Sequence, residues 1–160
     1  MVRYRRNRVG GGTYFFTVTL RDRRSDLLVR HVDLLRSSWR KAHARIAHEV
    51  IAAVVLPDHL HAVIRMRDGA DDYSRLWQEI KKGFSRNLPG ASPWQSRFWE
   101  HTIRDDTDLR GHIDYVHFNP VKHGWASKAV DWPFSSFHRY VRDGVLTPDW
   151  ATTPDEPTAP

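Results

Sequence analysis

The chain has 160 residues, which is enough for one domain with its own core, and it contains no cysteine, which excludes disulfides, cysteine-based zinc sites and thiol catalysis. Its 25 lysines and arginines outnumber 19 acidic residues, and the formal charge of +6 favours polyanionic partners, nucleic acid first among them. No apolar stretch is long enough to span a membrane and the N-terminus lacks the apolar core of a signal peptide, so we expect a cytoplasmic protein.

Residues 1–12 form a basic segment that ends in three glycines. Arginine forks suit phosphates and guanine edges, and a tyrosine ring can stack on a base. The segment is therefore either a DNA-binding arm or a solubilising tail, and its composition suits both. The candidate DNA-binding residues in it are Arg3, Tyr4, Arg5, Arg6 and Arg8.

Hydrophobic periodicity predicts a strand, a helix and a hairpin in the first 66 residues. Residues 13–20 are β-branched and aromatic, as in a strand. Apolar residues recur at steps of four and three over 25–46, which predicts an amphipathic helix with Ser25 or Asp26 as its N-cap. Residues 50–66 read VIAAVVLPDHLHAVIRM, and two apolar runs around a Pro-Asp turn predict a β-hairpin.

The second half of the chain predicts three more elements and two C-terminal segments. A helix begins at Asp71 or Asp72 and ends near Arg86, and its Lys81 and Lys82 form a candidate basic rim for DNA. A strand follows over 95–104. A third helix opens at Thr107 and ends at Pro120, because the residue before a proline avoids the α region. An aromatic segment then packs back until about Trp150, and the polar, proline-rich residues 151–160 are expected to be disordered.

The predicted element order is β-α-β-β-α-β-α, which indicates an α+β fold. A split β-α-β arrangement gives a ferredoxin-like antiparallel sheet with helices on one face, followed here by a C-terminal extension. We expect one domain over residues 13–150.

His59 and His61 alternate with apolar residues in the second strand of the hairpin. Side chains alternate across a strand, so the two imidazoles share one face, roughly 7 Å apart along it. That is close enough to ligate one metal ion, and imidazole is the commonest metal ligand. A lone His-x-His is more often a pair of exposed histidines, so the motif requires partners elsewhere in the chain.

The third helix offers such partners. At about 100° per residue, His112, Tyr115 and Asn119 fall within a sector of about 60° beside the apolar stripe. Tyr115 and Asn119 lie one turn apart. If this helix meets the histidine face of the hairpin, the two histidines and one oxygen ligand form a metal site next to a phenol.

This pattern resembles the single-tyrosine transposases of the HUH endonuclease superfamily, and most closely the REP-associated tyrosine transposases. The resemblance covers most of residues 13 to 141. Relatives from insertion sequences usually carry Gln four residues after the nucleophile, where this chain has Asn119, which leaves His112 and His117 as rival third ligands. The matching stretches are LPDHLHAVI (56–64), FWEHTIRDDTDLRGHIDYVHFNPVKHG (98–124) and WPFSSFHRYV (132–141).

The resemblance implies Mg²⁺- or Mn²⁺-dependent cleavage of single-stranded DNA, in which Tyr115 becomes joined to a 5′-phosphate. It also implies recognition of repeated palindromes folded as hairpins, by a protein that acts as a monomer, with a dimer as the alternative. A phenol has a pKa near 10, so it needs help to lose its proton from the metal, a water or Lys122, which is also a candidate DNA contact. The competing interpretation is a protein that binds hairpin DNA without cutting it.

Overall fold

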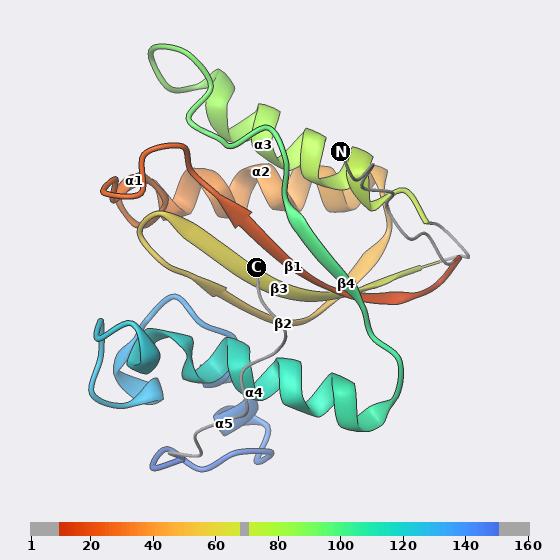
Figure 1. Ribbon diagram of the computed structural model, residues 1–160, viewed down its shortest axis with the longest axis vertical. Coiled ribbons are helices and arrows are strands. Elements are labelled where there is room, and N and C mark those ends of the chain that lie inside the picture. The colour runs from red at the N-terminus through yellow and green to blue at the C-terminus, as the bar shows by residue number, and fades with distance from the viewer. Residues whose placement is uncertain (1–9, 68–70, 151–160) are drawn as a thin grey trace, which may run out of the picture.

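A four-stranded antiparallel sheet, in the order β2-β3-β1-β4, lies between two layers of helices in the computed structural model, which describes residues 10–67 and 71–150 (Figure 1). The strands are β1 Thr13–Thr19, β2 His48–Val55, β3 His59–Met66 and β4 Trp99–Thr102. The helices are α1 Leu27–Arg30, α2 Val32–Arg45, α3 Tyr73–Arg86, α4 Asp106–Lys122 and α5 Phe137–Arg142, with a short 3-10 turn η1 Ala129–Asp131.

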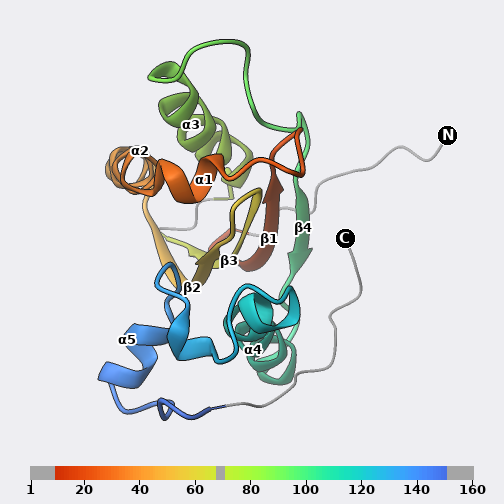
Figure 2. The same ribbon diagram turned by 90° about the vertical axis from the view of Figure 1, so that its left-hand side faces the viewer.

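The strand order and the two crossover helices confirm the predicted ferredoxin-like fold. Helices α2 and α3 cover one face of the sheet, while α4 and α5 belong to the C-terminal part and cover the other face (Figure 2). The central strands β3 and β1 are therefore buried on both sides. Side chains of β3 reflect this arrangement, since Leu60, Ala62 and Ile64 join the core under α2 and α3, whereas Val63 joins the core under α4.

The predicted helix over 25–46 is broken at His31, whose backbone (φ −115°, ψ 36°) leaves the helical region. The amide of Leu28 donates to the carbonyl of Pro57 at 3.2 Å, so α1 is tied to the hairpin turn while α2 packs against α3. Asp26 occupies the N-cap position without a side-chain bond, and the Ser25 hydroxyl accepts from the amide of Leu27 at 3.1 Å. Tertiary contacts thus divide the segment 25–46, whose apolar periodicity predicts a single helix, into α1 and α2.

Two other predicted boundaries were also wrong. Helix α4 does not end at Pro120 but continues to Lys122, because Asn119 and Pro120 are fully buried and packing overrides the local preference of the residue before a proline. The strand predicted over 95–104 is reduced to β4. The chain follows β1 at Gln95 and again from Trp99, but leaves the ladder between them, where Phe98 packs against the core under α3.

The segment 132–140 covers the outer edge of β2. The amide of Val55 donates to the carbonyl of Phe134, and Ala53 exchanges two hydrogen bonds with Ser136. Arg139 donates to the carbonyls of Val50 and Ile51 at 3.1 and 2.6 Å. Backbone groups that a neighbouring strand would otherwise pair with are thereby satisfied within the chain.

Helices of the described ranges include none long and apolar enough to cross a membrane. Most of the predicted arm over 1–12, with Arg3, Tyr4, Arg5, Arg6 and Arg8, falls outside the described residues, as does the predicted disordered segment 151–160. Gly12 directly precedes β1, and its carbonyl accepts from the amide of Met66 at 2.9 Å.

Candidate active site

Two buried histidines from β3 face α4, as the alternation of the strand predicts. The rings of His59 and His61 lie with their centroids 4.9 Å apart at a steep angle of 84°. Burial lowers the pKa of His59, and it lowers the pKa of His61 well below the usual value, with the charge of His59 adding to the effect. Both imidazoles are therefore held neutral, which is the form that binds metal ions.

Each imidazole is oriented through its Nδ1 atom. His59 donates from Nδ1 to the carboxylate of Asp58 at 2.9 Å, and the second oxygen of Asp58 accepts from Arg23 at 2.6 Å. Burial alone would raise the pKa of Asp58, but the hydrogen bonds from Arg23 and His59 lower it, so the carboxylate stays charged. His61 lies across from Thr17 in the neighbouring strand, with Nδ1 2.8 Å from its hydroxyl. These bonds leave Nε2 of both rings for a ligand.

Helix α4 brings Tyr115 to the same place. Its ring meets that of His61 edge to face at 5.3 Å, and it also contacts Phe15 of β1 at 5.9 Å. Asp105 caps the start of the helix by accepting from the amide of Asp108 at 2.8 Å, as the cluster of aspartates before an apolar run indicates. The buried Val116 fixes the helix on the core beneath it.

Lys122, two turns after Tyr115 on the same helix, reaches back to the phenol. Its Nζ atom donates to the hydroxyl oxygen of Tyr115 at 3.4 Å and lies 5.0 Å from the centre of the ring. A positive charge at this distance stabilises negative charge that develops on the phenol oxygen. The hydroxyl oxygen of Tyr115 thus has a cation beside it.

Asn119 lies one turn beyond Tyr115 and is fully buried. Both its carboxamide oxygen and its nitrogen lack a hydrogen-bond partner among the described residues, and so does Nε2 of His61. Buried polar groups are nearly always satisfied, and leaving one without a partner costs about 1–3 kcal/mol. The unpaired atoms of Asn119 and His61 are therefore each available to a ligand.

His123 completes the helical row at steps of four residues from Tyr115 and Asn119. Its ring lies 5.4 Å from that of His59, while Tyr115 lies against His61. The row on α4 therefore runs alongside the two histidines of β3, and Asn119 lies between its ends. His123 was not among the predicted site residues, although it lies four residues after Asn119, which is the spacing that placed Asn119 beside Tyr115.

Comparison with known proteins gives a consistent picture, although no family model matches the chain. It is 48% identical over 151 residues to the REP-associated tyrosine transposase of Escherichia coli K12, covering 94% of this chain and 92% of that protein. A putative REP-associated tyrosine transposase of Haemophilus influenzae is 38% identical, with 97% and 96% covered. This chain belongs to the REP-associated tyrosine transposases.

The structures agree as well. A solved REP-associated tyrosine transposase bound to a REP hairpin superposes with a TM-score of 0.95 and 46% identity, covering 99% of this chain and 96% of the other. The resemblance stated from the HUH and tyrosine motifs is thereby confirmed, and with it the class of enzyme, a tyrosine transposase.

In this transposase the two rival ligands lie apart from the histidine pair. His117 places Nε2 2.8 Å from the hydroxyl of Ser136 and packs against Tyr140 at 4.6 Å, on the side of α5. His112 hydrogen bonds to the carbonyl of Asp108, and its ring stacks on that of His101 at 4.6 Å. Neither ring contacts His59 or His61 among the ring contacts of the described residues.

The cluster of His101, Asp108 and His112 has metal-ligand chemistry of its own, since its candidate atoms lie within 4.8 Å of one another. Asp108, however, accepts from His101 at 2.8 Å and from the amide of Arg104 at 2.9 Å. Burial opposes ionisation, yet the bonds from Arg104 and His101 lower the pKa of Asp108 to about 2. The carboxylate is thus engaged in tying α4 to β4.

The candidate basic rim of α3 is not part of the site around Tyr115, since α3 covers the opposite face of the sheet. Lys81 donates to the carbonyl of Gln95 at 3.0 Å and covers the ring of Phe98 at 5.6 Å, which stabilises the chain before β4. Lys82 is exposed. Of the three predicted lysines, Lys122 alone lies beside Tyr115.

Proposed function

We propose that this transposase cleaves and rejoins single-stranded DNA at repeated palindromic hairpins, with Tyr115 as the nucleophile and a divalent metal ion as cofactor. The observation that supports this proposal most is the position of Tyr115 against His61, one helical turn before Asn119, whose buried carboxamide is unpaired among the described residues. Enzymes of this class would act in the cytoplasm, in association with the nucleoid.

The residues present fit a divalent cation. His59 and His61 would offer Nε2 and Asn119 its carboxamide oxygen, while Asp58 and Thr17 hold the two rings from behind. Imidazole nitrogens suit transition-metal ions and a carboxamide oxygen suits harder ions, so we propose Mn²⁺, or Mg²⁺ with water completing its coordination. Bound there, the ion would offset the charge of a non-bridging phosphate oxygen and orient the phosphate for in-line attack.

Tyr115 would supply the attacking oxygen. As the bond from Oη to phosphorus forms, the bond to the 3′-oxygen of the preceding nucleotide breaks, and this oxygen takes up a proton to leave as a 3′-hydroxyl. The 5′-phosphate then remains on Tyr115. Lys122, whose Nζ lies 3.4 Å from Oη, would stabilise the phenolate as its proton departs.

A phosphotyrosine link allows joining as well as cutting. The link is an ester of the same kind as the bond that was broken, so a free 3′-hydroxyl can attack it and release Tyr115. A hydrolase that uses water cannot rejoin DNA in this way. The geometry therefore suits strand transfer, which a transposase requires.

The proposed substrate is a hairpin with an adjoining single strand. A related transposase has been solved bound to a REP hairpin, and this chain shares its fold over almost its whole length. We assign phosphate and guanine contacts to the basic arm and a weaker, non-specific contact to Lys82. The proposed arm residues are Arg3, Tyr4, Arg5, Arg6 and Arg8.

We also propose that the protein works as a monomer. The edge of β2 is covered by residues 132–140, and the opposite edge strand, β4, has only four residues. Sheet edges of this kind resist pairing with another copy.

The test compares one repeat sequence as a hairpin with a single-stranded flank and as a fully paired duplex, in Mn²⁺ or Mg²⁺ at one salt concentration. We expect a covalent protein–DNA band with the flanked hairpin and none with the duplex. A continuous duplex is stiff over the length of DNA that would have to enter between β3 and α4. Equal cleavage of both would contradict the requirement for a single strand. Hairpin binding without any adduct would indicate a protein that binds without cutting.

A further inference from the structure

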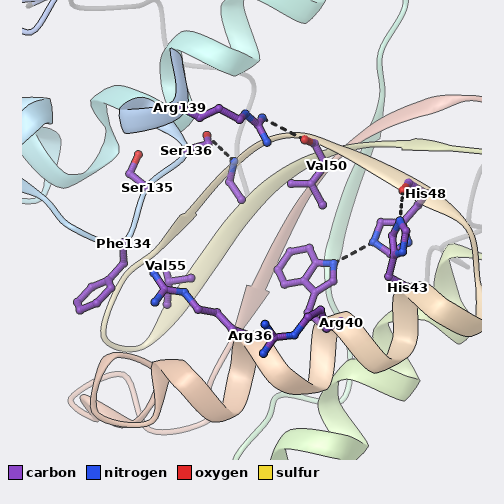
Figure 3. Close-up of a pocket in the computed structure, with 12 residues that line it drawn as sticks. Arg36, Arg40, His43, His48, Val50, Val55, Phe134, Ser135, Ser136 and Arg139 are labelled. Carbon is purple, nitrogen blue, oxygen red and sulfur yellow. Dashed lines mark hydrogen bonds between the residues drawn. The ribbon is translucent and has the colours of Figure 1, made fainter. Parts of the chain in front are cut away.

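A cavity of mixed apolar and basic lining lies on the other face of the sheet, between α2, the edge of β2 and the segment 134–139. Its volume is about 470 Å³, which is within the range of sites that hold small organic molecules. Figure 3 shows Arg36 and Arg40 extending from α2 on one side of it, with Ser136 and Arg139 across the β2 edge. The mechanism proposed above uses none of these residues.

The cavity is positively charged. Three of its lining residues are arginines, and no carboxylate is among those that the structure places around it. Arg139 is bound to backbone carbonyls, so its charge lacks a counter-ion there. Arg36 meets Asp33 only at 3.7 Å, with both side chains largely exposed, and Arg40 has no hydrogen bond or ion pair with the described residues. Such a cavity favours an anion with several acceptor oxygens.

Two aromatic rings give the cavity flat apolar surfaces. Trp39 donates from its indole nitrogen to Nε2 of His48 at 2.9 Å, and Nδ1 of His48 bonds to the carbonyl of Ile46 at 2.7 Å. These bonds fix the indole. Phe134 lies opposite α2 with the guanidinium of Arg36 5.8 Å from its ring. A planar ring that enters here can stack on an aromatic face or on a guanidinium.

We propose that this cavity binds one unstacked nucleotide of the single strand, with its phosphate on Arg36 and Arg40 and its base against Trp39 or Phe134. An anion joined to a flat ring is what the lining selects. Because β2 is the neighbour of β3 in the sheet, a DNA strand that leaves the active site and passes over the segment 132–140 would come to the cavity on the other side of this edge. The assignment of this nucleotide to the DNA strand rests on the proposed function. A free mononucleotide is the alternative occupant.

The test measures binding of a labelled hairpin with a single-stranded flank to the full chain in EDTA, where metal-dependent cleavage is absent. Arg36→Ala and Arg40→Ala should each weaken binding roughly tenfold or more and lower the log–log salt slope by about 0.7. Arg86→Ala, which removes an exposed arginine from α3 outside the cavity, is the matched control. Phe134→Leu, which keeps an apolar side chain but removes the ring, should weaken binding about fivefold or more.

Photo-cross-linking supplies a direct readout. Strands that carry 5-iodouracil at successive flank positions should cross-link to Trp39 or to the peptide containing Phe134 from one or two adjacent positions. If Arg36→Ala and Arg40→Ala bind no worse than Arg86→Ala, or if no cross-link reaches these peptides, the inference is overturned.

Two further outcomes separate the sources of the nucleotide. Binding of a deoxynucleoside monophosphate that depends on Arg40, together with strand binding that does not, would overturn the strand as occupant. Failure of the unmodified chain to bind any hairpin would overturn this inference together with the proposed function, whereas normal binding that ignores Arg36 and Arg40 overturns this inference alone.

Discussion

The phenol ring of Tyr115 and the imidazole ring of His61 meet edge to face, with centroids 5.3 Å apart and planes at 72°. One ring comes from α4 and the other from β3, so the contact depends on the packing of α4 against the sheet. It places the proposed nucleophile next to an imidazole whose Nε2 has no hydrogen-bond partner among the described residues. The chemistry of the site follows from this docking.

Asn119 should reveal a conflict between stability and metal binding. Replacing its buried, unpaired carboxamide with a side chain of similar size, Asn119→Leu, should stabilise the metal-free protein by about 1–3 kcal/mol. The same variant should lose the rise in Tm that Mn²⁺ gives the unmodified protein. Urea unfolding in EDTA and thermal melts with Mn²⁺ measure the two effects.

The control for this variant is Asn87→Leu, at the exposed C-cap of α3, which should leave the response to Mn²⁺ unchanged. An undiminished Mn²⁺ shift in Asn119→Leu would remove Asn119 from the ligand set. His123, whose ring lies against that of His59, would then be the next residue to test.

Lys122 should affect the rate of cleavage more than the binding of DNA. Lys122→Met removes the charge beside the phenol oxygen, and we expect cleavage to slow by about 10- to 100-fold at neutral pH. The loss should shrink as pH rises, because hydroxide then removes the phenol proton without help. Lys122→Arg should retain most of the rate. Single-turnover rates measured across pH check this.

Lys128→Met provides the matched control for Lys122, since it removes a lysine that is exposed and lies beyond the end of α4. If Lys122→Met lowers the affinity for DNA but leaves the single-turnover rate of cleavage equal to that of Lys128→Met, Lys122 is a DNA contact and does not activate Tyr115.

Arg139 should stabilise the fold and keep the sheet edge closed. Arg139→Ala removes the charged donor that the carbonyls of Val50 and Ile51 share, although Ile51 keeps the hydroxyl of Tyr140, and we expect a loss of about 1–3 kcal/mol in the free energy of unfolding. The exposed edge should also promote self-association, visible by sedimentation. Arg142→Ala, which removes only a surface pair with Asp143, should change neither. A stable, monomeric Arg139→Ala would contradict the role of the segment as an edge cover.

The sequence predicted that His59 and His61 share one face of a strand because alternation within a strand is a local property. His59 and His61 are directed toward α4 by the same pleat that buries Leu60 and Ala62 on the other side. The helical row of Tyr115 and Asn119 was equally local. Each half of the proposed site is therefore predictable from local sequence, whereas the contact between β3 and α4 is not.

Features that depend on distant contacts were missed. The break at His31 reflects the tie between Leu28 and Pro57, and the continuation of α4 through Pro120 reflects burial that a propensity rule does not include. Asp58 was predicted only as a turn residue, and its hydrogen bond to Nδ1 of His59 was not. The edge cover provided by Arg139 required knowing which strand lies at the edge of the sheet.

His48 should make stability depend on pH in the acid range. Burial lowers its pKa, against the opposing hydrogen bond to Ile46, so the unfolded chain takes up the proton first as pH falls. The stability that the neutral ring contributes is complete above the usual pKa of 6.5 and is lost as pH falls through the folded value. Urea unfolding at several pH values should show a shallower slope below about pH 6.5 for His48→Leu than for the unmodified chain. Equal slopes would show that His48 does not contribute to the acid sensitivity.

The most direct test of the account is the identity of the residue that becomes joined to DNA. The protein is incubated with a hairpin that carries a single-stranded flank in Mn²⁺, the covalent product is digested with trypsin, and the modified peptide is sequenced by mass spectrometry. The account predicts a 5′-phosphodeoxynucleotide on Tyr115, with Tyr115→Phe forming no adduct while still binding the hairpin. An adduct on another residue, or undiminished cleavage by Tyr115→Phe, would contradict it.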